Sequence, residues 1–352
     1  MEGSNEMTRY ALCIGIDQYP SPNTLNGCVS DATSWASILR AQGFNSVQML
    51  TDQQATFGGF LGAVNQIVQT AVPGDVVVIT YSGHGAKAPT VNGQMYAEGL
   101  VPIDFGTNGF IVDDDIGPIF DAARPNVAIN FILDSCFSGG AKRFLSNAPT
   151  TVAPGAAIRI RRLIATPEMI QVHQAAHARR HQNRALTTPG LLRECIFAAS
   201  ADNQVSLENS NGGYFTQSAI RVLQSNPGQL SNSSFVSQVI SLVGNLSPDF
   251  TENQGLPQHP QLRCPTDLQN GAFLGPIGMS TGTGNQTFNT GNQSFNTGNQ
   301  FTQSGNQTPL SSVPLVTTGV CQLPQNPSAS DLVAYLQCIS ATTRNFQGPN
   351  NH

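Results

Sequence analysis

The sequence predicts an α/β fold built on a mostly parallel sheet, and three observations support this prediction. Residues 76–80 and 127–133 are nearly uninterrupted apolar runs, the pattern of strands that are covered on both faces. Each run ends in small residues that turn the chain. Strand-like and helix-like segments alternate through the first 140 residues, which is typical of βαβ units.

The individual elements follow from the apolar periodicity and from the turn residues between segments. In the first part of the chain we expect strands at 10–16, 46–50, 76–82 and 127–133, helices at 31–41, 57–72 and about 115–123, and a hairpin near 95–102. Further along, we expect a strand at 195–200 and helices at 214–223 and 235–246. The compact fold is expected to end near Leu274.

Composition argues against several protein classes. The formal net charge of −5 argues against a dedicated nucleic-acid binder, and no segment has the roughly 18 uninterrupted apolar residues of a membrane helix. The first ten residues are acidic and polar where a secretory signal is basic and then apolar, so a cytoplasmic protein is expected. The seven cysteines are odd in number and form no CxxC pair, which predicts reduced thiols without a disulfide framework.

A histidine and a cysteine follow the two apolar runs. His84 lies in SGHG after the first run, and Cys136 lies in DSCFSGG after the second. Both therefore stand at strand carboxyl ends, which line the ligand crevice of an open parallel sheet. Either residue alone is usually a packing residue, but a thiol beside an imidazole forms a nucleophile for carbonyl groups. The pair predicts covalent catalysis by Cys136, with His84 as the proton-transferring group.

These motifs resemble the caspase-like cysteine peptidases, and the metacaspase branch in particular. YALCIGIDQYP, LNGCVSDA, GGYFTQSAI and LPQHPQL extend the resemblance over about residues 9 to 274. The resemblance implies a six-stranded, mostly parallel sheet flanked by helices, and a monomeric endopeptidase domain with a Cys–His dyad. It also implies an oxyanion hole formed by the backbone N–H groups of Gly85 and Cys136. A caspase-like scaffold with little or no catalysis, or a related peptidase of other specificity, remains an alternative.

The resemblance places four residues in the pocket for the residue before the cleaved bond: Cys28, Asp31, Ser82 and Asp134. Asp134 is two residues before Cys136 on a strand, so both side chains point to the same side. Two carboxylates in a semi-buried pocket favour a cation. Cleavage of peptides or proteins after Arg or Lys is therefore predicted, with Arg favoured by its planar fork. For Asp31, a place at the start of a helix is the alternative.

Residues 142–193 divide the peptidase region. The predicted organisation is an N-terminal extension at 1–8, a large-subunit region at 9–141, a basic linker at 142–193, a small-subunit region at 194–275, a low-complexity repeat at 276–310 and a C-terminal segment with one short helix at 311–352. The linker holds nine of the sixteen Lys and Arg residues. An Arg-directed peptidase beside such a linker predicts self-processing within it, and a solvated, irregular insertion is the alternative.

Acidic residues predict a calcium site. Asp104, Asp113 and Asp114 supply hard oxygen ligands in loop contexts, and the resemblance implies that such aspartates bind an activating calcium ion. Arg143 replaces a carboxylate that many relatives carry after the cysteine, which weakens the anionic set. Helix capping is the alternative for the aspartates at 113–115.

Two further segments are distinctive. His173, His177 and His181 recur every four residues, so a helix would align three imidazoles as in zinc or nickel sites. The neighbouring arginines favour instead a solvated basic helix. Between residues 281 and 308 a TGNQ-type repeat carries no charge and cannot bury a core. It predicts a disordered tail that is either a plain spacer or a self-associating segment.

Overall fold

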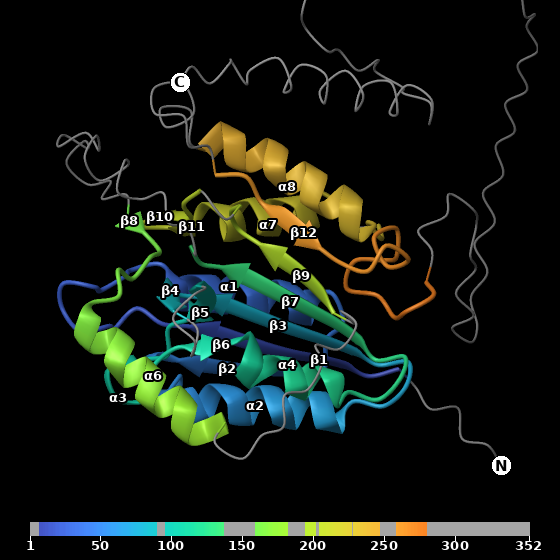
Figure 1. Ribbon diagram of the computed structural model, residues 1–352. Helices are drawn as coiled ribbons and strands as arrows, with labels where there is room; N and C mark the ends of the chain where they lie inside the picture. Colours follow the sequence, from blue (N-terminus) through green and yellow to red (C-terminus); the bar gives the residue numbers. More distant parts are fainter. Residues whose placement is uncertain are drawn as a thin grey trace, which may run out of the picture. The chain divides into compact units, whose positions relative to one another are not determined.

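The computed structural model describes residues 7–89, 96–136, 159–181, 194–201, 204–226, 228–246 and 258–279 (Figure 1). The chain divides into two units, 1–285 and 286–352, and every described residue belongs to the first. Several predicted features therefore lie outside the described residues. They are the repeat tail, the short helix expected within 311–352, Arg143, and the linker residues 142–158 and 182–193.

Six strands form the main sheet, in the order β12-β9-β7-β3-β1-β2. Their bounds are β1 Arg9–Gly15, β2 Ser46–Thr51, β3 Val76–Ser82, β7 Ala128–Asp134, β9 Cys195–Ala198 and β12 Gln261–Arg263. All pairings are parallel except that of β12 with β9. The predicted six-stranded, mostly parallel sheet is confirmed.

Helices cover both faces of this sheet (Figure 1). One face packs against α1 (Cys28–Ala41), α7 (Tyr214–Ser225) and α8 (Asn232–Leu246). The other packs against α2 (Phe57–Thr70) and α4 (Asp113–Asp121). Strand β3 shows why both layers are needed, because Val77 and Ile79 enter one core cluster while Val76 and Val78 enter the other.

Two small sheets and short helices complete the described part. One sheet contains β4 (Gly85–Pro89), β5 (Tyr96–Leu100) and β6 (Ile111–Val112), and the other contains β8 (Arg159–Ile160), β10 (Leu207–Asn209) and β11 (Gly212–Gly213). The 3-10 helix η1 spans Asp52–Gln54, and the short helix α3 spans Phe105–Asn108. Helix α6 (Pro167–His181) gives regular structure to part of the linker. The alternative prediction of an irregular insertion is therefore wrong for these residues.

Helix α1 begins three residues earlier than expected. The backbone N–H groups of Cys28 and Val29 donate to the carboxylate of Asp17, at 2.8 and 3.1 Å. A carboxylate that accepts these first-turn N–H groups stabilises the helix end. Because Asp17 lies eleven residues before Cys28, local sequence patterns do not reveal this cap.

The expectation of uniformly reduced thiols is wrong for one pair. Cys195 and Cys264 form a disulfide with a Cα–Cα distance of 4.3 Å. Strand β12 returns antiparallel beside β9, and its last residue, Arg263, pairs with Ile196, so the residue just after β12 reaches the start of β9. The topology, rather than a sequence spacing, brings the two cysteines together.

The helices of the structure can be compared with those that cross membranes. Among the described residues, no helix combines the length and the apolar character needed to cross a membrane.

Candidate active site

The structure places His84 and Cys136 just beyond the carboxyl ends of neighbouring strands. Ser82, the last residue of β3, pairs in register with Asp134, the last residue of β7. His84 and Cys136 each follow two residues later. The chain thus brings both residues to the same edge of the sheet, where an open α/β fold places its ligand crevice.

The backbone of His84 is held by two buried tyrosines. The hydroxyl of Tyr81 donates to the His84 carbonyl at 2.7 Å, and the backbone N–H of His84 donates to the hydroxyl of Tyr19 at 3.2 Å. A Cβ atom at Gly83 would clash with both hydroxyl groups. The first glycine of SGHG is therefore required by close packing under the histidine.

The imidazole of His84 has a defined tautomer. Its Nε2 lies 2.7 Å from the carbonyl oxygen of Asn23, which can only accept, so the hydrogen is on Nε2. Burial lowers the pKa of His84 to about 4, so the ring is neutral at pH 7. Its Nδ1 has no hydrogen-bond partner among the described residues, which leaves the lone pair of that nitrogen available to accept a proton.

Cys136 is fully buried, although it stands at the edge of the sheet where a ligand crevice was expected. Its thiol donates to the carbonyl of Gln204 at 3.3 Å, and its side chain packs with Val205, Leu207 and Tyr214. Its burial has a local cause, because the linker segment around Arg161 pairs with the backbone at the ends of β3 and β7.

The carbonyl oxygen of Arg161 is bound by two backbone donors. The N–H of Gly85 and the N–H of Cys136 each lie 3.1 Å from this oxygen. These are the two groups that the family resemblance assigned to an oxyanion hole. A second contact, from the N–H of Leu163 to the carbonyl of Gly85 at 2.9 Å, continues the pairing beyond Arg161. A backbone carbonyl of the linker therefore occupies the predicted oxyanion hole.

The Arg161 side chain enters a pocket of three carboxylates. Its guanidinium is fully buried and contacts the carboxylates of Asp31 at 2.5 Å, Asp134 at 3.1 Å and Glu208 at 3.2 Å. Glu208 accepts from both Nε and Nη2 of Arg161. The planar fork of an arginine suits this divided arrangement, whereas a single ammonium group does not reach all three positions.

Charge in this pocket is unbalanced. One guanidinium faces three carboxylates, so the set is formally at −2 when all are ionised. Burial raises the pKa of Asp31 to about 7 despite the nearby guanidinium. Burial also disfavours the charge of Arg161, but the carboxylates of Asp134 and Asp31 outweigh this effect and hold its pKa well above the usual value. The pocket is therefore built to retain a cation.

The pocket wall is itself fixed by hydrogen bonds. Asp134 accepts from the hydroxyls of Ser206 and Thr216, both at 2.7 Å, and from the N–H of Thr216 at 3.0 Å. A Cβ atom at Gly213 would clash with the Asp134 carboxylate and the Arg161 guanidinium. The GGYFTQSAI motif thus supplies the backbone space and the donor that position Asp134.

The four predicted pocket residues are brought together. Asp31 and Asp134 contact the guanidinium, and the Cys28 thiol lies 3.7 Å from the Glu208 carboxylate. Ser82 is buried at the end of β3, beside Asp134 in the register. Asp31 does lie in the first turn of α1, as its alternative proposed, but its carboxylate accepts from Gly213 and Arg161 rather than capping the helix.

Sequence reasoning missed three positions of the candidate site. Glu208 completes the pocket, but it lies in a short strand without a motif. The carbonyl of Asn23 orients His84, and a backbone contact of this kind leaves no signal in residue type. Arg161 was only one of nine basic linker residues, and nothing in the linker pattern distinguishes it.

The aspartates proposed for calcium occupy helix starts. Asp104 precedes α3 and accepts from the N–H of Phe57 at 2.7 Å and from the Asn108 side chain at 2.8 Å. Asp113 and Asp114 are exposed in the first turn of α4. The described residues contain two groups of three possible ligands within 4.8 Å of one another, Asp115/His177/His181 and Asp17/Cys28/Glu208, and the three predicted aspartates form neither group.

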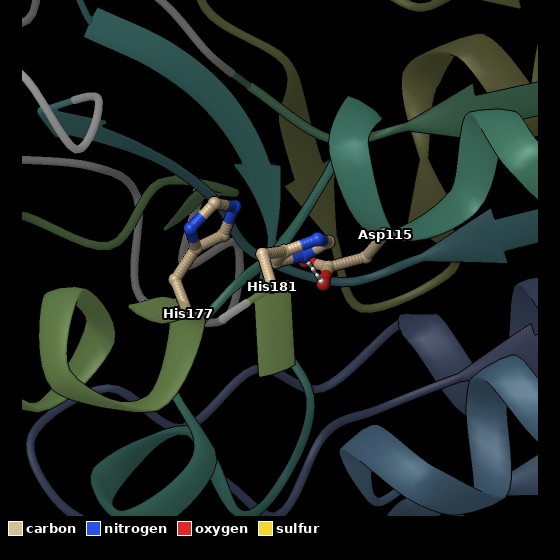
Figure 2. Close-up of side chains that lie close together, drawn as sticks. All are labelled: Asp115, His177 and His181. Atoms are coloured by element: carbon tan, nitrogen blue, oxygen red, sulfur yellow. Dashed lines mark hydrogen bonds and ion pairs between the residues drawn. The ribbon is translucent and has the colours of Figure 1, made fainter. Parts of the chain in front are cut away.

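The three linker histidines lie on one helix, but that helix is not solvated on their side. In α6, His173 and His177 are buried against the body of the fold, and His173 Nδ1 accepts from the N–H of Phe110 at 3.2 Å. Figure 2 shows His177 and His181 beside Asp115 of α4. The expectation of a solvated basic helix is wrong because α6 packs these imidazoles against α3 and α4.

Comparisons with known proteins identify the family of the chain. A family model for the caspase domain matches residues 8–269. Metacaspase-1B of Aspergillus niger is 37% identical over 146 residues, covering 38% of this chain and 33% of that protein. Metacaspase-1 of Cryptococcus neoformans is 39% identical over 144 residues, covering 37% and 32%. The chain thus spans about a third of the length of these curated relatives.

A solved structure supports the fold independently. The crystal structure of a Geobacter sulfurreducens protein aligns with a TM-score of 0.57 at 20% identity, covering 73% of this chain and 92% of that chain. At this identity the likeness concerns the fold alone. Because the caspase-domain model matches most of the chain, the resemblance predicted from the motifs is confirmed, and the chain belongs to the caspase domain family, with metacaspases among its relatives.

Proposed function

We propose that the protein is a cysteine endopeptidase that cleaves after arginine or lysine, with arginine preferred. The observation that supports this most directly is the position of Arg161. Its carbonyl oxygen accepts from the Gly85 and Cys136 N–H groups while its side chain fills the three-carboxylate pocket. A bound substrate needs both contacts at once, one for the acyl oxygen and one for the side chain before the cleaved bond.

The proposed reaction uses the groups already described. The Cys136 thiol gives its proton to Nδ1 of His84, and the sulfur attacks the carbonyl carbon of the substrate arginine. The Gly85 and Cys136 N–H groups stabilise the resulting oxyanion. His84 then returns the proton to the leaving amine, and water hydrolyses the thioester. The contact between Asn23 and Nε2 keeps Nδ1 available throughout.

Self-processing forms a second part of the proposal. The carbonyl that binds the two backbone donors belongs to the Arg161–Arg162 peptide bond, which supports this bond as the one that Cys136 attacks. Cleavage there would break the bond between Arg161 and the rest of the linker, so that the new chain end at Arg161 could leave the pocket and open it to other substrates. Before cleavage, the linker competes with other substrates for the same pocket.

Peptide turnover tests the proposed specificity. Fluorogenic peptides ending in Arg, Asn or Asp are expected to show turnover with Arg alone, measured with and without calcium. Replacing Asp134 with Asn removes one of the charges facing the guanidinium and is expected to reduce kcat/KM for the Arg peptide by about 100-fold, since charge-assisted hydrogen bonds are worth about 1.5–3 kcal/mol. Preferred turnover of the Asp peptide would contradict the proposal, and no turnover of any peptide would favour the scaffold alternative.

Glu208 is expected to set the preference of arginine over lysine. Its carboxylate accepts from Nε and Nη2 of the bound guanidinium, and lysine has no counterpart of Nε. Glu208→Gln is therefore expected to lower kcat/KM about tenfold for Arg peptides and less for Lys peptides. Asp134→Asn provides the comparison, because it is expected to lower kcat/KM for both the Arg and the Lys peptides. An unchanged Arg-to-Lys ratio in the Glu208 variant would contradict this role.

The buried imidazole predicts a pH dependence of stability. Burial lowers the pKa of His84 to about 4, whereas an unfolded histidine titrates near about 6.5. The unfolded state therefore binds more protons between these values. Stability contributed by the neutral ring is present above pH of about 6.5 and is lost as the pH falls toward about 4, by up to about 3 kcal/mol.

A variant pair isolates this effect from other titrating groups. Thermal unfolding of Cys136→Ala is compared with that of Cys136→Ala/His84→Gln between pH of about 7.5 and 4.5. The variant with His84 is expected to lose stability more steeply as the pH falls. Parallel curves would show that His84 keeps an ordinary pKa in the folded protein.

Calcium stimulation and tail assembly are further parts of the proposal. Exposed Asp113 and Asp114 at the start of α4, together with the family resemblance, support a calcium ligand set near this turn. The charge-free repeat supports self-association outside the catalytic region. Deleting the residues after 280 is expected to leave peptide turnover unchanged and to reduce self-association.

A further inference from the structure

The contact between the linker helix and α4 gathers groups that the proposed reaction does not use. We propose that His177, His181 and Asp115 form a binding site for a divalent transition-metal cation of the zinc class, with Asp114 as a fourth ligand. The site joins α6, a linker helix, to α4, a helix of the peptidase body (Figure 2). It shares Asp114 with the proposed calcium ligands but adds two imidazole nitrogens, which suit zinc and not calcium.

The geometry brings these donors close together. One ligand atom from each of Asp115, His177 and His181 lies within 4.8 Å of the others. The Nε2 atom of His181 is 3.0 Å from an Asp115 oxygen, and Nε2 of His177 is 3.5 Å from an Asp114 oxygen. Ligands about 2.0–2.2 Å from a tetrahedral zinc ion lie about 3.3–3.5 Å apart. Small side-chain rotations are therefore enough to complete the site.

The helix holds two imidazoles on one face, and one of them is buried. His177 and His181 are four residues apart on α6, with ring centroids separated by 4.2 Å, so both project from the same face. His177 is 6% exposed, yet its Nδ1 has no hydrogen-bond partner among the described residues.

Arg180 is the main opposing charge. Its Nε and Nη2 donate to Asp115 at 3.1 and 3.4 Å. It also has two anchors away from this carboxylate, the carbonyl of Asn108 at 2.9 Å and the ring of Phe57 at 4.0 Å. Arg180 can therefore give up its hydrogen bond to one Asp115 oxygen and keep its other contacts. The carboxylates of Asp114 and Asp115 offset the positive charge of the metal ion.

The second cluster of possible ligands is already engaged. In the group formed by Asp17, Cys28 and Glu208, the Asp17 carboxylate accepts from the start of α1 and Glu208 holds the Arg161 guanidinium. A dication there would have to displace a buried arginine. The α4–α6 site has the better donors and the weaker competitor.

A metal at this site would fasten the linker to the peptidase body. Helix α6 begins six residues after Arg161, so a cation bridging α6 and α4 restrains the segment that fills the cleft. This consequence rests on the proposed function, because it predicts that zinc holds the leaving amine of Arg162 near the acyl-enzyme and so slows net cleavage after Arg161. The binding site itself does not depend on catalysis.

Binding is tested on the full chain carrying Cys136→Ala, which removes the reactive thiol. Zinc is expected to raise the melting temperature, and Co²⁺ is expected to give the visible absorption of a tetrahedral site with one ion per chain. Asp114→Asn, at an exposed position that should not disturb folding, is expected to weaken affinity about tenfold, and His181→Ala by more than tenfold. His259→Ala, at an exposed histidine elsewhere, is the matched control. Equal zinc affinity in all variants, or no binding to the Cys136→Ala chain, would overturn the site.

Self-processing of the parent chain separates the two proposals. Zinc is expected to slow the appearance of linker fragments, and His181→Ala is expected to remove part of this inhibition. If zinc inhibits both chains equally, it acts at Cys136 and His84, and the restraint by α6 is refuted. If the parent chain never processes itself while the Cys136→Ala chain binds zinc as described, the proposed function fails and the metal site stands.

Discussion

In the presence of calcium, the 352-residue chain is expected to cut itself between Arg161 and Arg162 and to yield fragments 1–161 and 162–352. Among the described residues, the Arg161 carbonyl is the one that accepts from both Gly85 and Cys136, so its carbonyl carbon is the one presented for attack. Intact-mass spectrometry and sequencing of the new amino terminus identify the bond. Removing the nucleophile is expected to reduce the rate by at least about 10³-fold.

The matched controls for this result are two cysteine variants. Cys136→Ala is expected to remain intact, whereas Cys13→Ser is expected to process itself at the rate of the parent chain. Cys13 is a suitable comparison because it is equally buried, and burial raises the pKa of its thiol to about 12. Processing of Cys136→Ala would indicate another peptidase. Cutting of the parent chain only at other basic residues of 142–193 would show that the position of Arg161 does not select the bond.

The sheet and the dyad are predictable from sequence for a physical reason. Strands β3 and β7 are covered on both faces, so their continuous apolar runs are visible in the residues themselves. His84 and Cys136 immediately follow these runs, and the parallel register fixes their common edge. Local pattern and tertiary position coincide at these two residues.

The rest of the site depends on contacts between residues distant in the chain. Glu208 approaches Arg161 from 47 positions away, and Asp31 approaches it from 130. The disulfide between Cys195 and Cys264 likewise follows from an antiparallel return across 69 positions. The residue types alone do not predict these pairings, because each pairing depends on where the linker and the small sheets pack.

The second large effect concerns stability. Arg161→Ala, made in the Cys136→Ala chain, is expected to lower the free energy of unfolding by about 3–5 kcal/mol, because it leaves three buried carboxylates without their cation. The carboxylates of Asp31 and Asp134 are as buried as the guanidinium they face. Chemical denaturation and melting temperature give the measurement. Arg159→Ala is the control on the same segment, since its side chain makes one exposed hydrogen bond, to the Thr24 carbonyl.

Ligand rescue distinguishes an emptied cation pocket from a generally damaged fold. A small guanidinium compound such as arginine amide is expected to raise the melting temperature of the Arg161→Ala chain, because it binds the native pocket and not the unfolded chain. The same compound is expected to have little effect on the Arg159→Ala chain, in which Arg161 still fills the pocket. Arg161→Lys should fall between the two, since an ammonium restores charge but not the forked contacts with Glu208. The opposite result would be an Arg161→Ala chain as stable as the Arg159→Ala chain, with a melting temperature that the guanidinium compound does not change. The three carboxylates would then not form a cation pocket, and the proposed arginine preference would lose its physical basis.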